Sequence, residues 1–164
     1  MKQTSISIPV KIFSDYAALE ADDRSLLETA MQATGDAYAP YSDFRVGVAV
    51  RLGNGKVITG SNQENASYPA GICAERVALS AASAVYPGIP VTVLALTYIN
   101  KSGISNLPIS PCGICRQSLA EYEQRFEQPI RLIMSGKTGE VYMVNQATDL
   151  LPLAFSGKEI KTRL

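Results

Sequence analysis

The sequence places all of its cysteines in two short segments, Cys73-Ala74-Glu75-Arg76 and Pro111-Cys112-Gly113-Ile114-Cys115-Arg116-Gln117. Each segment stands where a helix is expected to start, and unpaired backbone N–H groups and the positive end of a helix dipole favour anionic sulfur there. Three thiolates leave one position open on a tetrahedral zinc ion, which distinguishes a catalytic zinc from a structural one. We therefore expect Cys73, Cys112 and Cys115 to hold one Zn²⁺, with water as the fourth ligand.

The chain contains no histidine. This excludes every catalytic triad based on histidine and every metal site with a histidine ligand, and it leaves the thiols as the ligands for a soft metal. Two alternatives exist for the cysteines. They could be unpaired thiols buried as small apolar side chains, or Cys112 and Cys115 could form a redox pair beside an idle third thiol. Their spacing favours the metal site over both alternatives.

Size and charge indicate one soluble domain that acts on a small molecule. The 164 residues suffice for a sizeable core, and we divide them into an N-terminal extension, residues 1–21, and a single zinc-dependent domain, residues 22–164. Lys and Arg number 15, as do Asp and Glu, so no excess positive charge attracts nucleic acid. No apolar run approaches the length of a membrane span. An odd number of cysteines favours a reducing compartment, and we expect a cytoplasmic protein.

Helices alternate with strands along the chain, which is typical of a layered α/β sheet. Residues 91–99 are apolar and β-branched with almost no charge, as in a central strand that is covered on both faces. Residues 5–13 alternate in polarity and predict a short strand at the edge of the sheet. Other strands are expected at residues 44–52 and 57–59 (a hairpin), 130–134 and 141–144, and helices from Asp22 to before Pro40, over residues 73–85, and from the Cys112–Cys115 pair to Arg125.

Glu75 is the candidate proton carrier. Zinc-dependent nucleobase deaminases share the signature H-x-E followed by P-C-x-x-C, and a variant has three cysteine ligands. Cys73 stands at the histidine position of this signature, and Glu75, Pro111, Cys112 and Cys115 fill the others. Side chains two residues apart on a helix point in different directions, so Glu75 reaches the site only if Cys73 occupies the helix cap. Glu75 would then carry protons from water to a ring nitrogen and to a leaving amine. The alternative is a glutamate that stabilises the first turn of the helix.

Arg76 is the candidate for balancing the charge of the sulfurs. Zn²⁺ with three thiolates carries a net formal charge of about −1, which weakens the ion as a Lewis acid. Arg76 follows Glu75 directly, and its guanidinium group could donate charged hydrogen bonds to a thiolate. The alternative is a solvated cation on the surface of the helix.

The sequence resembles the small, homotetrameric cytidine deaminases from about Leu26 to Phe155. The matching segments are YAPYSDFRVG at residues 38–47, NQENASY at 62–68, CAER at 73–76, PCGICRQ at 111–117 and LLPLAF at 150–155. The resemblance implies a three-layer α/β/α fold with a mixed sheet of roughly five strands, one Zn²⁺ per subunit, and a homotetramer with active sites shared between subunits. It further implies hydrolytic deamination of cytidine and 2′-deoxycytidine to the uridine forms with release of ammonia, in pyrimidine salvage.

Within the subunit, the resemblance assigns four residues to the nucleoside. Phe44 lines the nucleoside pocket, and the backbone near Ala66 reads the base. Asn62 and Glu64 hold the ribose hydroxyls, which is chemically sensible because an amide and a carboxylate together offer donors and acceptors. The alternatives are core packing for Phe44 and ordinary turn or loop positions for Asn62 and Glu64.

The resemblance places two further aromatic residues, Tyr68 and Phe155, in the pocket of a neighbouring subunit. Core packing is the alternative for Phe155. Two features depart from the family pattern: about twenty residues precede the matching region, and Leu153 stands where glycine is common.

Two other functions compete with this interpretation. A deaminase of the same fold could act on another aminated heterocycle, such as an antibiotic nucleoside, although the Asn62 and Glu64 pair favours an ordinary ribose. A structural zinc module that mediates interactions would need a fourth protein ligand, and the sequence has no fourth cysteine and no histidine.

Overall fold

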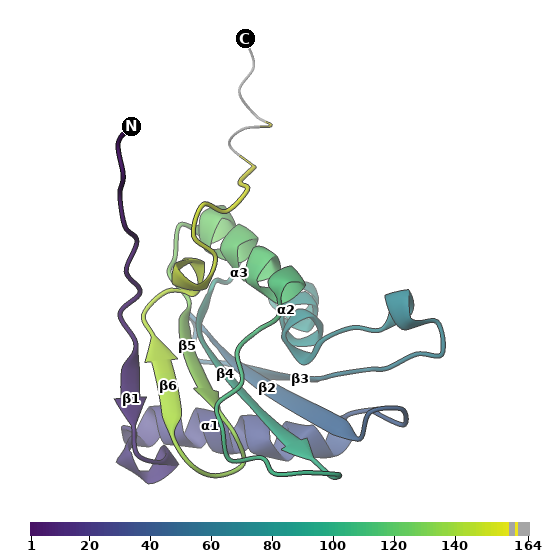
Figure 1. Ribbon diagram of the computed structural model, residues 1–164. Coiled ribbons are helices and arrows are strands. Elements are labelled where there is room, and N and C mark those ends of the chain that lie inside the picture. The colour runs from purple at the N-terminus through teal and green to yellow at the C-terminus, as the bar shows by residue number, and fades with distance from the viewer. Residues whose placement is uncertain (158–159, 161–164) are drawn as a thin grey trace.

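A mixed β-sheet forms the middle layer of the structure (Figure 1). The computed structural model describes residues 1–157 and residue 160. The six strands lie in the order β1-β6-β5-β4-β2-β3, one more than the roughly five expected. Their bounds are Lys11–Phe13 for β1, Phe44–Leu52 for β2, Val57–Ser61 for β3, Val91–Asn100 for β4, Arg131–Ser135 for β5 and Val141–Val144 for β6.

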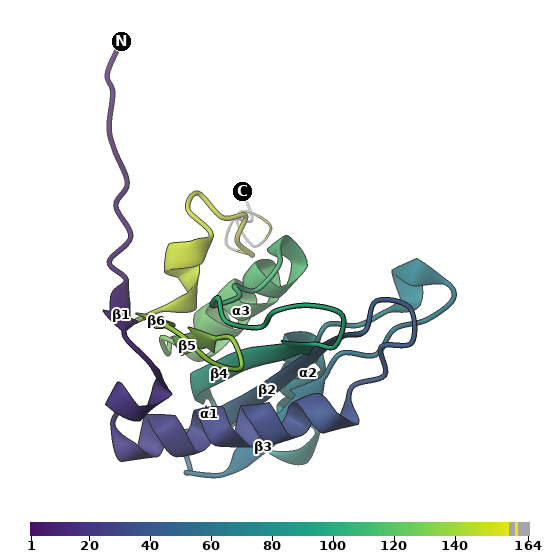
Figure 2. The same cartoon turned by 60° about the horizontal axis from the view of Figure 1, so that its bottom comes forward.

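Helices cover both faces of the sheet, which confirms the expected three-layer α/β/α arrangement (Figure 2). Leu27 of α1 packs in a core with Ile133 of β5 on one face. Leu79 of α2 and Leu119 of α3 pack in a separate core on the other face. The α-helices are α1 Ala21–Ala33, α2 Ala74–Val85 and α3 Gly113–Phe126, and the short 3₁₀ helices are η1 Tyr16–Ala18, η2 Thr34–Asp36, η3 Tyr68–Ala70 and η4 Ala147–Leu150.

Strand β4 is the buried central strand that its apolar sequence predicts. Ala95 belongs to the core under α1, whereas Leu94 and Leu96 belong to the core under α2 and α3. These three side chains are at most 1% exposed. Alternation toward two cores explains why the strand is apolar at nearly every position.

The N-terminal strand is shorter than predicted. The expected strand covered residues 5–13, but only Lys11–Phe13 pair, antiparallel to β6. Strand β6 has four residues, so it offers few partners, and Pro9 has no N–H group to donate to a sheet. Residues 1–10 have no regular secondary structure.

Two crossover connections bring the starts of α2 and α3 to the same edge of the sheet. Strand β2 is antiparallel to both β3 and β4, so β3 and β4 run in the same direction. Helix α2 connects β3 to β4, and α3 connects β4 to the parallel strand β5. Each helix therefore begins near the carboxyl end of the strand before it, where ligands bind in open α/β sheets.

Gly60 of β3 allows the first turn of α2 to lie directly on the sheet. A Cβ atom at Gly60 would lie 2.5 Å from the carbonyl oxygen of Ala74 and 2.5 Å from the backbone nitrogen of Ala78. No side chain fits between β3 and this part of α2.

Among the described residues, none of the helices combines the length and apolarity needed to cross a membrane.

We predict that Gly60→Ala lowers the free energy of unfolding by about 2 kcal/mol, because the added methyl group overlaps the backbone of α2. Urea unfolding of the purified protein measures this change. Gly35→Ala is the matched control, since no atom lies within 4 Å of the Cβ position there. Equal destabilisation by the two substitutions would contradict the close approach of α2 to β3.

Candidate metal centre and the adjoining pocket

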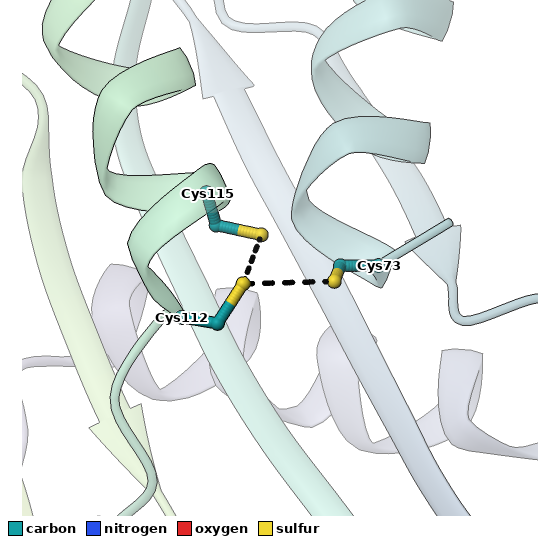
Figure 3. A group of neighbouring side chains, drawn as sticks. All are labelled: Cys73, Cys112 and Cys115. Carbon is teal, nitrogen blue, oxygen red and sulfur yellow. Dashed lines mark hydrogen bonds between the residues drawn. The ribbon is translucent and has the colours of Figure 1, made fainter. Parts of the chain in front are cut away.

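The cysteines lie together where α2 and α3 begin, with their sulfur atoms directed toward one another (Figure 3). Cys73 is the N-cap residue of α2, Cys112 is the N-cap residue of α3, and Cys115 lies in the first turn of α3. The Sγ atom of Cys112 is 3.8 Å from that of Cys73 and 3.5 Å from that of Cys115. All of the Sγ atoms lie within 4.8 Å of one another.

These distances fit one zinc ion. Sulfur atoms bound about 2.3 Å from a tetrahedral Zn²⁺ lie about 3.8 Å from one another, close to the separations observed. No other histidine, cysteine, aspartate or glutamate of the described residues belongs to the group. The protein thus provides three ligands to a four-coordinate ion, as expected from the sequence.

The surroundings of Cys73 favour its thiolate form. Its interaction with the Cys115 thiol, then with the Cys112 thiol, and the charge of Arg76 together lower the pKa of Cys73 to about 6. The pKa of Cys115 is raised by its interaction with Cys73 and by burial. One thiol of the group is therefore ionised first, and a thiolate is the form that binds a metal.

Arg76 influences the cysteines through its charge. Its side chain is half-buried, and it donates no hydrogen bond to the sulfur atoms within the described part of the chain. The charge of Arg76 nevertheless contributes to the lowered pKa of Cys73. The expected hydrogen bond from guanidinium to thiolate is thus not formed in this structure, whereas the electrostatic effect is present.

Glu75 lies in the first turn of α2, next to the cysteine at the cap. Its side chain is 4% exposed, and burial raises its pKa. Together with Cys73 and Cys112 it lines a pocket of about 300 Å³. The glutamate therefore lines the same space as two of the candidate ligands.

A second pocket, of about 480 Å³, adjoins the one at Glu75, since Asn62 and Cys73 line both, and we call the two together the combined pocket. Phe44, Asn62 and Glu64, which are predicted to bind the nucleoside within their own subunit, line this combined pocket. Tyr68, which is predicted to enter the pocket of a neighbouring subunit, lines it as well. Sequence reasoning assigned no role to Ile109 and Ser110 of the first pocket, because they belong to no motif. Tyr41, Ser42 and Val46 lie in the matching segment at residues 38–47, but the resemblance assigned a role in that segment only to Phe44.

The side chain of Asn62 binds the backbone of β2. Its Oδ1 atom accepts a hydrogen bond from the backbone N–H of Val46 at 2.7 Å, and its Nδ2 atom donates to the carbonyl oxygen of Phe44 at 3.0 Å. These two bonds use one acceptor position and one donor of the amide. The second Nδ2 hydrogen and the second Oδ1 lone pair remain for a ligand.

Glu64 binds the turn that precedes β2. Its carboxylate accepts hydrogen bonds from the backbone N–H groups of Tyr41, at 2.9 Å, and Ser42, at 3.3 Å, and from the Ser42 hydroxyl group. The bond from the Ser42 hydroxyl and the bond from Tyr41 lower the pKa of Glu64. The carboxylate is therefore ionised and held in one orientation at neutral pH.

The remaining predicted residues do not line the pocket at Glu75, although Tyr68 lines the second, adjoining pocket. Ala66 and Tyr68 are in the loop between β3 and α2, which projects from the sheet (Figure 1). Tyr68 is 76% exposed and contacts Tyr41 edge-on, with ring centroids 6.0 Å apart. Phe155 is 63% exposed and lines a different pocket, beside the outer side of α3. Its carbonyl oxygen accepts a hydrogen bond from Gln117 at 3.0 Å.

Comparison with known proteins agrees with the zinc site that the cysteines form. Residues 20–126 match the family described as cytidine and deoxycytidylate deaminase zinc-binding region. A cytidine deaminase from Halalkalibacterium halodurans is 35% identical over 139 residues, which cover 85% of this chain and 98% of the relative. A cytidine deaminase from Mycobacterium tuberculosis is 36% identical over 139 residues, 83% of this chain and 91% of the relative.

Solved structures agree with the sequence relatives. The crystal structure of cytidine deaminase from Burkholderia pseudomallei superposes with a TM-score of 0.70 at 39% identity, covering 80% of this chain and 97% of that one. The cytidine deaminase from Mycobacterium tuberculosis superposes with a TM-score of 0.64 at 31% identity, covering 84% and 99%. With its three-layer fold and its cysteines arranged to hold one zinc ion, the chain belongs to the cytidine deaminase family of hydrolases.

Proposed function

We propose that this protein hydrolyses cytidine and 2′-deoxycytidine to uridine and 2′-deoxyuridine, with release of ammonia, and serves pyrimidine salvage in the cytoplasm. The observation that carries the proposal is the buried carboxylate of Glu75 beside an incomplete set of metal ligands, in the combined pocket, which Asn62 and Glu64 also line. A nucleoside whose base lies at Glu75 would have its sugar near the Asn62 amide and the Glu64 carboxylate.

Cys73, Cys112 and Cys115 would hold the zinc ion at the edge of the sheet. When bound there, zinc supplies the Lewis acidity that lowers the pKa of water toward neutrality. Arg76 offsets part of the negative charge of the thiolates through space, which favours this Lewis acidity.

Glu75 moves the protons of the reaction. Its carboxylate takes a proton from the attacking water and delivers it to the ring nitrogen N3, while the water oxygen bonds to C4. Glu75 then transfers the remaining proton of that oxygen to the amine. The C4–N bond breaks, a carbonyl group forms at C4, and ammonia leaves, so that cytidine and water give uridine and ammonia.

The walls of the pocket orient the nucleoside. Phe44 contacts the base or sugar with its ring, and the backbone near Ala66 contacts the base. The free hydrogen of the Asn62 amide donates to a sugar hydroxyl, and the fixed carboxylate of Glu64 accepts from one. Neither group distinguishes a 2′ hydroxyl from a hydrogen, which supports the use of both nucleosides.

Four copies of the chain would complete the active sites. Tyr68 and Phe155 are large side chains that lie mostly exposed in the subunit, and neither lines the pocket at Glu75 of its own chain. In a homotetramer, each would enter the pocket of a neighbouring subunit, which would bury its apolar surface and enclose the substrate.

A substrate panel tests the function. We expect protein with one zinc per chain to release ammonia from cytidine and 2′-deoxycytidine. The rates should be at least about a hundredfold lower with cytosine, which lacks the sugar, with adenosine, which has a different base, and with dCMP, since no Lys or Arg of the described residues lines either pocket to pair with its phosphate. Enzyme-coupled detection of ammonia measures the rates, and metal analysis measures the zinc. Inactivity of zinc-loaded protein toward both nucleosides would refute the proposal.

Glu75→Gln should retain zinc and lower kcat by at least about 10²-fold, since an amide cannot carry the protons. Steady-state kinetics and metal analysis of the same sample separate the two effects. Glu121→Gln is the matched control, because Glu121 is an exposed glutamate on α3, and it should leave kcat unchanged. Full activity of Glu75→Gln would exclude the proton-transfer role.

Sharing of active sites predicts complementation between two impaired variants. Phe155→Ala should weaken turnover on the order of tenfold, by loss of an aromatic contact, and Glu75→Gln should abolish it. In mixed oligomers, a Phe155→Ala subunit with an intact Glu75 receives Phe155 from its neighbour. Co-expressed and separately tagged chains should therefore be more active than either variant alone. Additive activities, or a monomer in analytical ultracentrifugation, would contradict shared sites.

A further inference from the structure

The ring of Phe44 stacks on a second aromatic ring that lies outside the pocket. Its centroid is 4.7 Å from that of Tyr98, and the two ring planes differ by 20°. Tyr98 belongs to β4, is 6% exposed, and does not line the pocket at the metal centre. Phe44 does line this pocket and is half-buried. Tyr98 therefore contacts a pocket wall from behind.

The register of the sheet produces this contact. Val46 of β2 pairs with Tyr98 of β4, and Phe44 pairs with Asn100. Phe44 and Tyr98 are thus diagonal neighbours, and diagonal pairs of aromatic side chains on one face of a sheet are within contact distance. Val46 packs on the core under α2 and α3, so the face that carries both rings is the face of the metal centre.

Phe44 stands at a position where its ring needs support. It is the first residue of β2 and follows Asp43, which has the left-handed φ of 54°. Its backbone is fixed, because its N–H group donates to the Ser42 hydroxyl oxygen at 3.0 Å and its carbonyl oxygen accepts from Asn62 at 3.0 Å. Neither bond restrains the side-chain torsions, and a half-exposed phenylalanine samples several rotamers unless a neighbour selects one.

We propose that Tyr98 is a positioning residue for nucleoside binding, which selects the orientation in which the Phe44 ring forms the pocket wall. This inference rests on the proposed function. Tyr98 suits the role because it lies on a central strand with its side chain buried, so the ring stacked on it is held before the ligand arrives. A wall fixed in advance lowers the entropic cost of binding, whereas Glu75 and the thiols are untouched.

The effect is therefore expected on binding and not on the chemical step. Tyr98→Leu should raise the KM for cytidine about three- to tenfold and change kcat less than twofold, with unchanged zinc content. Calorimetric titration with uridine should show a Kd raised by the same factor, which is a readout independent of turnover. Tyr98→Phe keeps the ring and should restore wild-type KM and Kd.

A matched control separates positioning from general loosening of the fold. Tyr142 lies on β6 and packs, half-buried, against the core under α2 and α3, but it lines neither part of the combined pocket. Tyr142→Leu should leave the KM for cytidine and the Kd for uridine unchanged. If Tyr98→Leu does not fold, Tyr98→Met carries the same test, because it removes the ring but keeps much of the volume.

The outcomes distinguish this inference from the proposed function. Unchanged KM and Kd in Tyr98→Leu, while the wild type deaminates cytidine, would overturn the role of Tyr98 alone. An equal rise of KM in Tyr142→Leu, or no recovery in Tyr98→Phe, would overturn it as well. A wild type that is inactive on cytidine would instead overturn the proposed function.

Discussion

The structure depends on one constraint, the convergence of two helix N-termini on a single point at the edge of the sheet. Strands β3 and β4 run in the same direction, so the helices that follow them start on the same side. Each N-terminus presents unpaired N–H groups and a positive dipole end, which stabilise anionic sulfur. Cys73 and Cys112 occupy the caps and Cys115 follows one turn later. Moving either helix would separate the ligands. A side chain at position 60 would displace α2 from β3, so this position requires glycine.

Around this centre, the polar residues of the pocket also hold its walls. Asn62 and Glu64 use part of their hydrogen-bonding capacity on the backbone between residues 41 and 46, and keep the rest for a ligand. This backbone segment includes Phe44, whose ring stacks on the ring of Tyr98. The site is thus arranged before a nucleoside enters, which is how enzymes avoid reorganisation during the reaction. Buried Glu75 lines the same pocket as this wall and as two of the cysteines.

Much of this arrangement was predictable from local sequence. Three cysteines without histidine define the ligand chemistry, and the apolar run at residues 91–99 identifies the central strand. The misjudged parts depend on distant partners. The N-terminal strand is only as long as its pairing with β6 allows. Tyr98 was missed because no motif marks a tyrosine whose importance comes from the ring across the sheet.

The sequence by itself determined which atoms can bind a metal and where the helices that carry them begin. Residue type and short-range spacing are sufficient for this, because caps and the three-residue separation of Cys112 and Cys115 are local properties. Only the tertiary structure decided that Asn62 and Glu64 hold the start of β2 and that Phe44 stacks on Tyr98. These contacts join residues far apart in the chain, so they depend on strand order, register and the closeness of helix to sheet, which no short segment encodes.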